Sequence, residues 1–393
     1  MEFGVERAAV LLLISAVVAI VTQRLRLPYS VGLVAAGIVL AFIPFSPQIS
    51  LTKSLLFTVF LPPLIFEGAF SLEWRQLRRD LPLVLVLATV GVVLSAAATT
   101  AGMHLLTDWP WTSALVFGAL ISATDPVSVI AAFKGAQVRG RLRLLVESES
   151  LFNDGTAAVL FAICVAAATG NSPTPAQVSG RLVVMIVGSL VCGAVVAYAT
   201  LLLAGGTQDH LVEITFTSVA AYGSFLLAEH LHLSGVLATL VAGLILGNVR
   251  TMKYIPDADR EAILSFWNYA AFVANSLIFL LIGMRVGRQH FVGFWYSVAI
   301  AIVLVVLSRA IAVYPCCRLF SRSTLRVSMR QQQVLFWGGL RGALALALAL
   351  SLPAEVPQRE SIIAVSFAVV AFSIFVQGLT LKPMLRKLDE IPG

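Results

Sequence analysis

Six ionisable side chains stand inside long apolar runs of the sequence. They are Glu67, Asp125, Glu149, Asp154, Arg309 and Arg341. The runs are long enough to cross a lipid bilayer, where a charge at the centre costs between about 3 and 17 kcal/mol. Because a charge that persists at such a cost is a candidate for function, we expect these residues to bind ions or protons, or to neutralise one another.

Asp154 is the central candidate. If its helix begins near Arg143, Asp154 lies about 15 Å along that helix, at the midplane of the membrane. Ser150 comes four residues earlier and shares the same helix face. We also place Asn153 among the residues of the ion site, where it can orient a neighbouring polar group. A carboxylate and a hydroxyl that present oxygens to one point suit a hard cation. The sequence therefore predicts a Na+ site at Asp154.

Further oxygen ligands are expected where helices are interrupted. The segment Ala123-Thr124-Asp125-Pro126 contains a proline, which removes a backbone donor and kinks or ends a helix. The freed carbonyls and the side chains of Thr124 and Asp125 can then face the cation. Glu67 follows the pair Pro62-Pro63 at a comparable depth, where irregular backbone is again expected. For Thr124, as for other hydroxyls in membrane helices, the alternative is a hydrogen bond to its own backbone.

The two arginines and Glu149 are expected to balance these negative charges. Gly338-Gly339-Leu340-Arg341-Gly342 is a second interrupted segment, because its three glycines weaken a helix. We assign Arg341 to offset Asp125 and the exposed carbonyl ends of the broken helices. Arg309 lies about 13 Å and Glu149 about 8 Å from the cytoplasmic ends of their helices, a difference that a long arginine can bridge, so we expect an ion pair between them. Two interpretations of this pair stay open, a structural brace and a part of the ion site.

Together these residues imply competition between two ligands. Burial disfavours the charged form of a carboxylate, and either a cation or a proton can neutralise it, but not both at once. If the empty charged site cannot cross a dry barrier and either neutralised form can, a cation is obligatorily exchanged for a proton. The sequence thus predicts a secondary antiporter and not an enzyme, with Na+ (or Li+) and protons as transported ions and no cofactor.

The composition describes a chain that is membrane domain throughout. Of its 393 residues, 59% are hydrophobic and 12% are charged, whereas about a quarter of the residues of a soluble domain are charged. No polar stretch is long enough for a separate soluble domain, so residues 1–393 are expected to form a single membrane transport domain. We assign the net charge of +7 to orientation in the lipid bilayer and not to a nucleic-acid partner.

Apolar runs between charged or Pro/Gly/Asn-rich breaks predict thirteen transmembrane helices. With thirteen crossings, six basic residues fall on one side of the membrane and nineteen on the other. By the positive-inside rule the N-terminus is then outside and the C-terminus cytoplasmic, in a plasma or inner membrane. The predicted ranges are 8–23, 29–44, 53–70, 82–106, 112–133, 143–168, 178–203, 211–229, 234–249, 263–284, 291–317, 332–351 and 361–385.

Thirteen helices divide into six, one and six. The first six span 8–168, a linking helix spans 178–203, and the second six span 211–385. Because there is a single linking helix, the second group enters the membrane from the opposite face to the first. The two groups therefore form an inverted repeat, and each has a broken fifth helix. Interrupted helices at matching positions indicate the binding site of a transporter. The predicted fold is therefore an all-α polytopic membrane protein.

Four segments also resemble, in order, the signatures of the monovalent cation:proton antiporter family, in its sodium/proton exchanger branch of bacterial type. The resemblance implies a homodimer with a mobile core that contains both broken helices, elevator-like alternating access, and a role in pH homeostasis. It implies that Asp154 carries the exchanged ion or proton, and it favours the Glu149–Arg309 pair. Ser150, Thr124, Asp125 and Glu67 would contribute directly or through water. An Asn153-Asp154 pair, in place of two aspartates, resembles the electroneutral branch. The four segments are Leu61–Glu67, Ala123–Val127, Glu149–Asp154 and Trp337–Ala343.

Three other functions fit parts of the sequence. A potassium/proton or proton-coupled organic-substrate exchanger would use the same core. An intramembrane hydrolase would use Asp125 and Asp154 as acid and base, but it leaves the interrupted helices and the buried arginines unexplained. A channel would show flux far above exchanger rates and an electric current.

Overall fold

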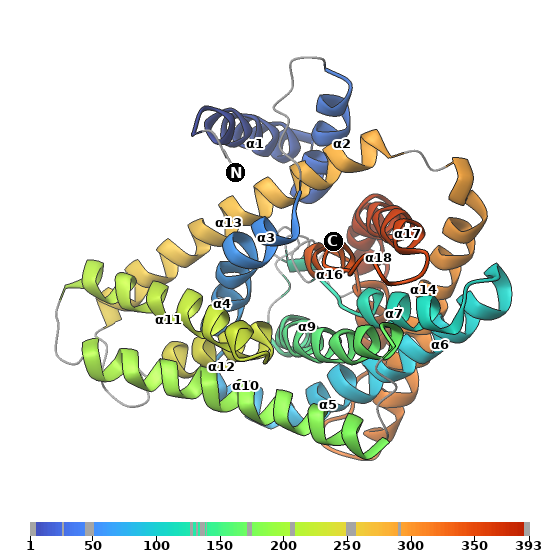
Figure 1. Ribbon diagram of the computed structural model, residues 1–393. Helices are drawn as coiled ribbons and strands as arrows, with labels where there is room; N and C mark the ends of the chain where they lie inside the picture. The colour runs from blue at the N-terminus through green and yellow to red at the C-terminus, as the bar shows by residue number, and fades with distance from the viewer. Residues whose placement is uncertain are drawn as a thin grey trace.

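The computed structural model of the chain is a bundle of helices, shown in Figure 1. It describes residues 5–25, 27–43, 51–125, 129–130, 133, 138, 140–170, 175–204, 209–248, 257–289 and 292–388. These ranges contain helices, turns and irregular segments and no β-strand. The all-α prediction is therefore confirmed for the described part of the chain.

The helices of the first part of the chain match the order expected from the apolar runs. Two of them contain a short π-helical turn, η1 at Leu56–Phe60 and η2 at Leu87–Gly91. The α-helices are α1 (Val5–Leu25), α2 (Tyr29–Ala41), α3 (Lys53–Leu55), α4 (Leu61–Ser71), α5 (Trp74–Val86), α6 (Val92–Thr107), α7 (Trp111–Ile121) and α9 (Arg141–Ala168).

The remaining helices follow in the same way after the connection at 169–174. A short 3-10 turn, η4 (Val292–Phe294), precedes α14, and a π-helical turn, η5 (Ser373–Gln377), lies inside the last helix. The α-helices are α10 (Pro175–Ala204), α11 (His210–His230), α12 (Gly235–Asn248), α13 (Asp257–Arg288), α14 (Trp295–Leu319), α15 (Met329–Trp337), α16 (Ala343–Leu350), α17 (Arg359–Phe372) and α18 (Gly378–Lys387).

The number of segments agrees with the sequence-based count. Among the described residues, nine continuous helical stretches are long and apolar enough to cross a membrane. The helices α2, α7 and α12 are shorter and apolar, and α15 with α16 forms the remaining segment. The thirteen expected segments are therefore found in the expected order. Their grouping into two inverted repeats stays a prediction.

One predicted boundary is wrong. The fourth helix was expected at 82–106, with Arg75, Arg78 and Arg79 in the connection before it, but a continuous helical stretch runs from Trp74 to Thr107. Its first turns are amphipathic, so hydropathy alone does not detect them. Leu77 and Asp80 are buried on one face while the arginines stay exposed on the other. The basic residues thus lie on the helix itself.

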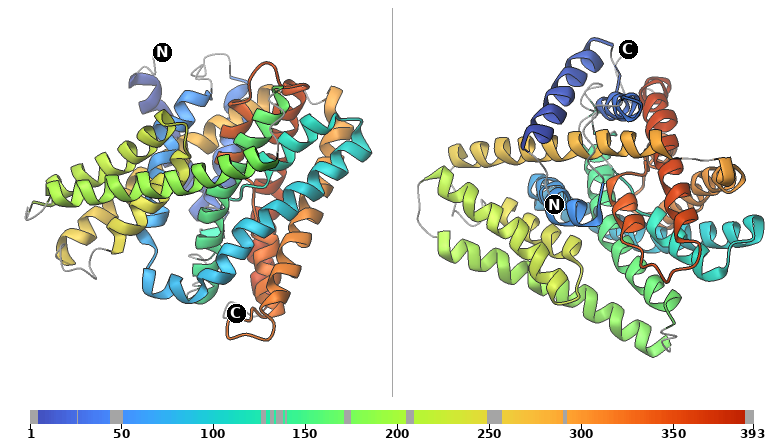
Figure 2. Two further views of the ribbon diagram at one scale, coloured as in Figure 1. Left: turned by 60° about the horizontal axis from the view of Figure 1, so that its bottom comes forward. Right: turned by 45° about the horizontal axis from the view of Figure 1, so that its top comes forward.

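The helices fall into two packed groups. Figures 1 and 2 show α10, α11 and α12 side by side along one edge of the molecule. A hydrophobic cluster joins this group to α4 and α13 through residues such as Phe66, Phe70 and Trp267, and it is separate from the larger core around α7, α9 and α14–α17. The long helix α13 crosses α2 closely, because a Cβ on Gly283 would collide with the Val34 carbonyl. The site described next lies in the larger core.

Candidate functional site

Two interrupted helices meet in the middle of the larger core. The helix α7 ends at Ile121, and the chain from Ala123 to Asp125 is not helical. The second interruption separates α15 from α16 at residues 338–342. The Asp125 backbone N–H donates a hydrogen bond of 2.7 Å to the Leu340 carbonyl. The structure therefore brings both breaks together. Pro126 and Val127, which belong to the first expected motif, lie outside the described residues.

Arg341 neutralises the carbonyl end of α7. Its Nη1 donates hydrogen bonds to the carbonyls of Ser122 at 2.8 Å and Ala123 at 3.2 Å. The residue is 2% exposed. A helix C-terminus carries a partial negative charge, so a guanidinium in this position is favourable. This placement matches the expected contact with exposed carbonyls. The Arg341 Nε is buried, and no residue in the described part of the chain accepts a hydrogen bond from it.

Ser373 and Gln377 were not among the predicted site residues. Ser373 Oγ accepts a hydrogen bond of 3.1 Å from the Arg341 backbone N–H, and its hydroxyl donates to Gln377 Oε1. The Gln377 amide donates to the Trp337 carbonyl at 3.4 Å. Both side chains are buried in the π-helical turn η5, and they hold the two ends of the second break. The available signal was two polar residues four apart inside an apolar run, which share a helix face.

Asp154 lies beside the first break. The Ser150 hydroxyl donates to the Thr124 carbonyl at 2.5 Å, and the Thr124 hydroxyl donates to Ser150 Oγ at 3.2 Å. The Thr124 backbone N–H forms a hydrogen bond with the Asp154 carboxylate, whereas the buried Asp154 Oδ1 has no hydrogen-bond partner among the described residues. Asp154, Ser150 and Thr124 therefore form one group of oxygen atoms, in which Ser150 bonds to the broken segment and not to its own helix.

Asp125 faces the second break. A Cβ on Gly342 would collide with the Asp125 carboxylate, so the absence of a side chain at Gly342 makes room for it. The negative charges of Asp125 and Glu149 both act on the Asp154 carboxylate. The structure thus places Asp154 and Asp125 at the two interrupted segments, which is the arrangement expected of a cation site, while the nearby Glu149 is paired with Arg309.

Glu149 and Arg309 form a bidentate ion pair. The two guanidinium nitrogens lie 2.8 Å and 2.9 Å from the two carboxylate oxygens, and the side chains are 3% and 7% exposed. Arg309 Nη2 also donates to the Leu335 carbonyl at 3.0 Å. The Asn153 amide donates to Glu149 Oε1 at 3.4 Å, while Asn153 Oδ1 has no hydrogen-bond partner within the ranges that the structure describes. The pair therefore joins α9, α14 and α15 one turn away from Asp154.

Glu67 lies on α4, which passes next to α9. A Cβ on Gly68 would press against the Leu151 side chain, so the two helices touch beside Glu67. The irregular backbone expected near Pro62-Pro63 is the π-helical turn η1, where the Leu61 N–H bonds to the Leu56 carbonyl. Pro62 and Pro63 then occupy the first turn of α4, where missing backbone donors are tolerated.

Comparisons with known proteins agree with this geometry. A family model described as "Sodium/hydrogen exchanger, transmembrane" matches residues 10–387. The chain is 36% identical over 400 residues to the low-affinity Na(+)/H(+) antiporter NhaS1 of Synechocystis, covering 99% of this chain and 76% of that protein. It is 34% identical over 391 residues to the Na(+)/H(+) antiporter NhaH of Halobacillus aidingensis, covering 96% of each.

The fold is also known from a solved structure. The sodium proton antiporter MjNhaP1 from Methanocaldococcus jannaschii superposes with a TM-score of 0.77 at 19% sequence identity, and the match covers 97% of both chains. At that identity it establishes the arrangement of the helices.

Proposed function

The chain belongs to the sodium/hydrogen exchanger family, and on this basis we propose that it exchanges Na+ for H+ across a membrane by alternating access. One observation carries the assignment of the site. The Asp154 carboxylate lies where α9 meets the break after α7, and that break is bonded to the break between α15 and α16. Interrupted helices that meet around a buried carboxylate are typical of ion sites in secondary transporters.

The proposed ligands are oxygen atoms. Asp154 binds either Na+ or a proton, with the hydroxyls of Ser150 and Thr124 as further cation ligands. Asp125 and Glu67 act directly or through water. Because one carboxylate accepts one positive ligand at a time, release of the first is required before the second binds. One Na+ then moves against one proton, and the exchange is electroneutral.

The arginines keep this site near neutrality. Arg341 offsets the carbonyl end of α7, so that the charge that changes during the cycle is that of Asp154. Arg309 neutralises Glu149 permanently. As a result, Na+ and the proton compete for the Asp154 carboxylate and not for that of Glu149. Asn153 orients Glu149 from the turn that carries Asp154. We therefore assign Asn153, Glu149 and Arg309 to positioning and Asp154 to binding.

The wider assignment follows the same reasoning. We propose two inverted six-helix repeats, within about 8–168 and 211–385, linked by the helix expected at 178–203. The N-terminus is outside and the C-terminus cytoplasmic in a plasma or inner membrane, where the protein serves pH homeostasis. The protein works as a homodimer and needs no cofactor and no catalytic residue.

Proton flux in reconstituted vesicles tests the proposal. An imposed Na+ gradient is expected to drive H+ in the opposite direction, and clamping the membrane potential is expected to leave the rate unchanged. Asp154→Asn should abolish the flux in a protein that still purifies as a folded species. Thr156→Val is the matched control, because the Thr156 hydroxyl donates a hydrogen bond to the Phe152 carbonyl of the same helix.

The same assay separates the alternatives. Flux driven by K+ and not by Na+ or Li+ would replace the proposal with potassium/proton exchange. A current that follows the applied potential would indicate a channel, and full activity of Asp154→Asn would remove the assigned site.

A further inference from the structure

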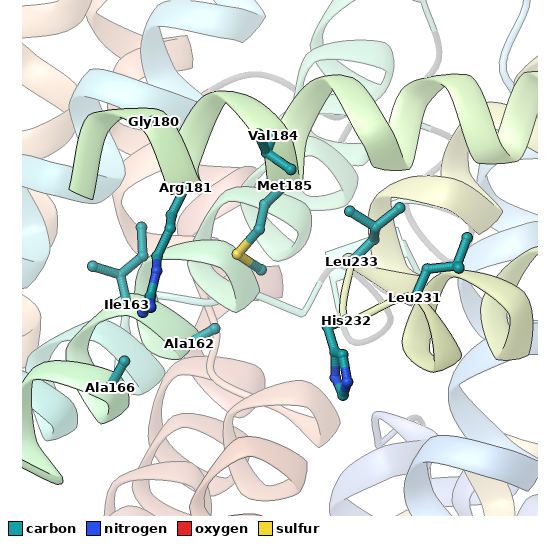
Figure 3. Close-up of a pocket in the computed structure, with 10 residues that line it drawn as sticks. All are labelled: Ala162, Ile163, Ala166, Gly180, Arg181, Val184, Met185, Leu231, His232 and Leu233. Carbon is teal, nitrogen blue, oxygen red and sulfur yellow. The ribbon is translucent and has the colours of Figure 1, made fainter. Parts of the chain in front are cut away.

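A cavity lies between α9, α10 and the turn that joins α11 to α12, as Figure 3 shows. Its volume is about 560 Å³, within the range of roughly 300–1,000 Å³ that is usual for sites that hold small molecules. It is separate from the ion site. The lining residues are Ala162, Ile163, Ala166, Gly180, Arg181, Val184, Met185, Leu231, His232 and Leu233.

The lining combines an apolar wall with two basic side chains. Only Arg181 and His232 carry ionisable groups, and no lining residue is acidic. In the part of the chain that the structure describes, the Arg181 guanidinium takes part in no hydrogen bond or ion pair. Figure 3 shows its side chain running from α10 toward Ile163 of α9. Glu229 lies near His232, and its Oε1 accepts a hydrogen bond from the Gly235 N–H at 3.1 Å.

The cavity lies close to the ends of its helices. The helix α9 ends at Ala168, six residues after Ala162, so the cavity extends about 9 Å from the helix end. Arg181 is six residues from the start of α10, and His232 comes two residues after the end of α11. Helix ends in a membrane protein lie where the lipid headgroups meet the acyl chains. Basic groups at this level face phosphate, while the apolar lining faces hydrocarbon.

The cavity also lies on a boundary between two helix groups. The turn after α11 is fixed to α10, because the Ser234 N–H donates to Ser189 Oγ at 2.9 Å and a Cβ on Gly193 would collide with the Ala238 carbonyl. The opposite wall is α9, which carries Asp154 about two turns deeper than Ala162. A molecule in the cavity therefore touches the helix of the ion site and the α10–α12 group at the same time.

From this combination we infer that the cavity binds one anionic phospholipid of the surrounding bilayer. The lipid phosphate pairs with Arg181 and His232, and an acyl chain packs on Ile163, Val184, Met185 and Leu233. Charge complementarity selects an anionic over a zwitterionic headgroup, because the rim supplies positive charge without a carboxylate among the lining residues. A lipid that bridges α9 and α10 would also alter the rate of exchange, and this consequence rests on the proposed function.

Native mass spectrometry of the purified protein tests the binding directly. The full chain is mixed with phosphatidylglycerol or phosphatidylcholine, and retained lipid adducts are counted for each. Wild type is expected to retain phosphatidylglycerol preferentially. The double variant Arg181→Gln, His232→Gln should weaken retention by about fivefold, the loss expected for the one permanent charge removed at Arg181. Ala162→Trp, which fills the cavity and keeps both charges, should also lose the adduct.

Controls make each outcome decisive. Arg285→Gln removes an exposed basic residue at the end of α13 and is expected to retain lipid as wild type does. Equal retention of both lipids by wild type, or undiminished retention by the double variant and by Ala162→Trp, would overturn the proposal. Displacement of the lipid by soluble glycerol phosphate would show a free-anion site in place of a lipid site.

Transport provides the second readout. In vesicles of pure phosphatidylcholine, wild type and the double variant are expected to exchange Na+ for H+ at the same rate, which shows that the variant is folded. Adding phosphatidylglycerol should change the rate of wild type and not that of the double variant. If neither protein exchanges ions, the proposed function fails, while the adduct measurement still decides the lipid site.

Discussion

The Asp125 backbone N–H and the Leu340 carbonyl are 2.7 Å apart, although 215 residues separate them in the chain. This hydrogen bond joins the two interrupted helices at the point where each has lost its own backbone pairing. In a membrane interior an unpaired backbone group costs several kcal/mol, and no water is available to replace the partner. The first break thus supplies a hydrogen-bond donor and the second an acceptor. Joined in this way, the two interrupted helices lie together beside the acidic side chains.

Gly342→Ala tests how tightly this unit is packed. The new Cβ would collide with the Asp125 carboxylate, so the side chain or the backbone must move. We expect a loss of about 1–3 kcal/mol in stability, as for other overpacked sites, together with a clear loss of exchange. Thermal unfolding and vesicle flux measure the two effects. Gly223→Ala is the matched control, since its Cβ would meet only Val196 at 4.0 Å, and wild-type behaviour of both variants would contradict the close packing.

Arg341→Lys tests the neutralisation of the α7 carbonyl end. Lysine keeps the charge, but its ammonium nitrogen stands one bond nearer the backbone than the Arg341 Nη1, which donates to both Ser122 and Ala123, so both contacts should lengthen. Hydrogen bonds from a charged group contribute about 1.5–3 kcal/mol, so the exchange rate should fall roughly 10- to 100-fold. Arg318→Gln, at the exposed end of α14, should have little effect. A fully active lysine variant would show that charge alone suffices.

A double-mutant cycle tests the ion pair between Glu149 and Arg309. Each single change to leucine leaves the other charge buried and should lower stability by about 3–5 kcal/mol. The double change removes both charges and should be less harmful than the sum of the two, because no unpaired charge remains. Unfolding midpoints of the four proteins measure the coupling. If the stability losses of the two single variants simply add in the double variant, the 2.8 Å ion pair makes no coupling contribution to the free energy of unfolding.

The pH dependence of the apparent KM for Na+ tests competition at one carboxylate. Lowering the pH raises the proton concentration, so more Na+ is required to displace the proton. Where the site is mostly protonated, the KM should rise about tenfold for each unit of pH, and at high pH it should become constant. Initial rates over a matrix of Na+ concentration and pH provide the measurement. A KM that stays constant while only the maximal rate changes would exclude a shared site.

Much of this arrangement could be predicted from residue types and spacing. Asp154 and Ser150 share a helix face because four residues separate them, and both contact the predicted break at Thr124. The Glu149–Arg309 contact was predicted because their estimated depths on separate helices are within reach of a long arginine, and it is present in the structure. These relationships depend on helix periodicity and on the rarity of charge in apolar runs, and both can be read in the sequence.

Other features depend on packing that the sequence does not display. The π-helical turn η5 places Ser373 against the Arg341 backbone, but no local residue type marks a π turn in an apolar run. The start of α5 was missed because its polar face resembles a loop by hydropathy. The cavity beside Arg181 is formed by three separate segments, so it appears only once their positions are known.

The pairing of the two halves has a consequence for biosynthesis. Glu149 and its partner Arg309 are 160 residues apart, which corresponds to about 10–30 s of translation at 5–20 residues per second. During that interval the acidic helix has been made, while the guanidinium that neutralises it has not. The nascent first half must therefore hold its carboxyl groups protonated, or keep α9 near water, until the ribosome completes the second half.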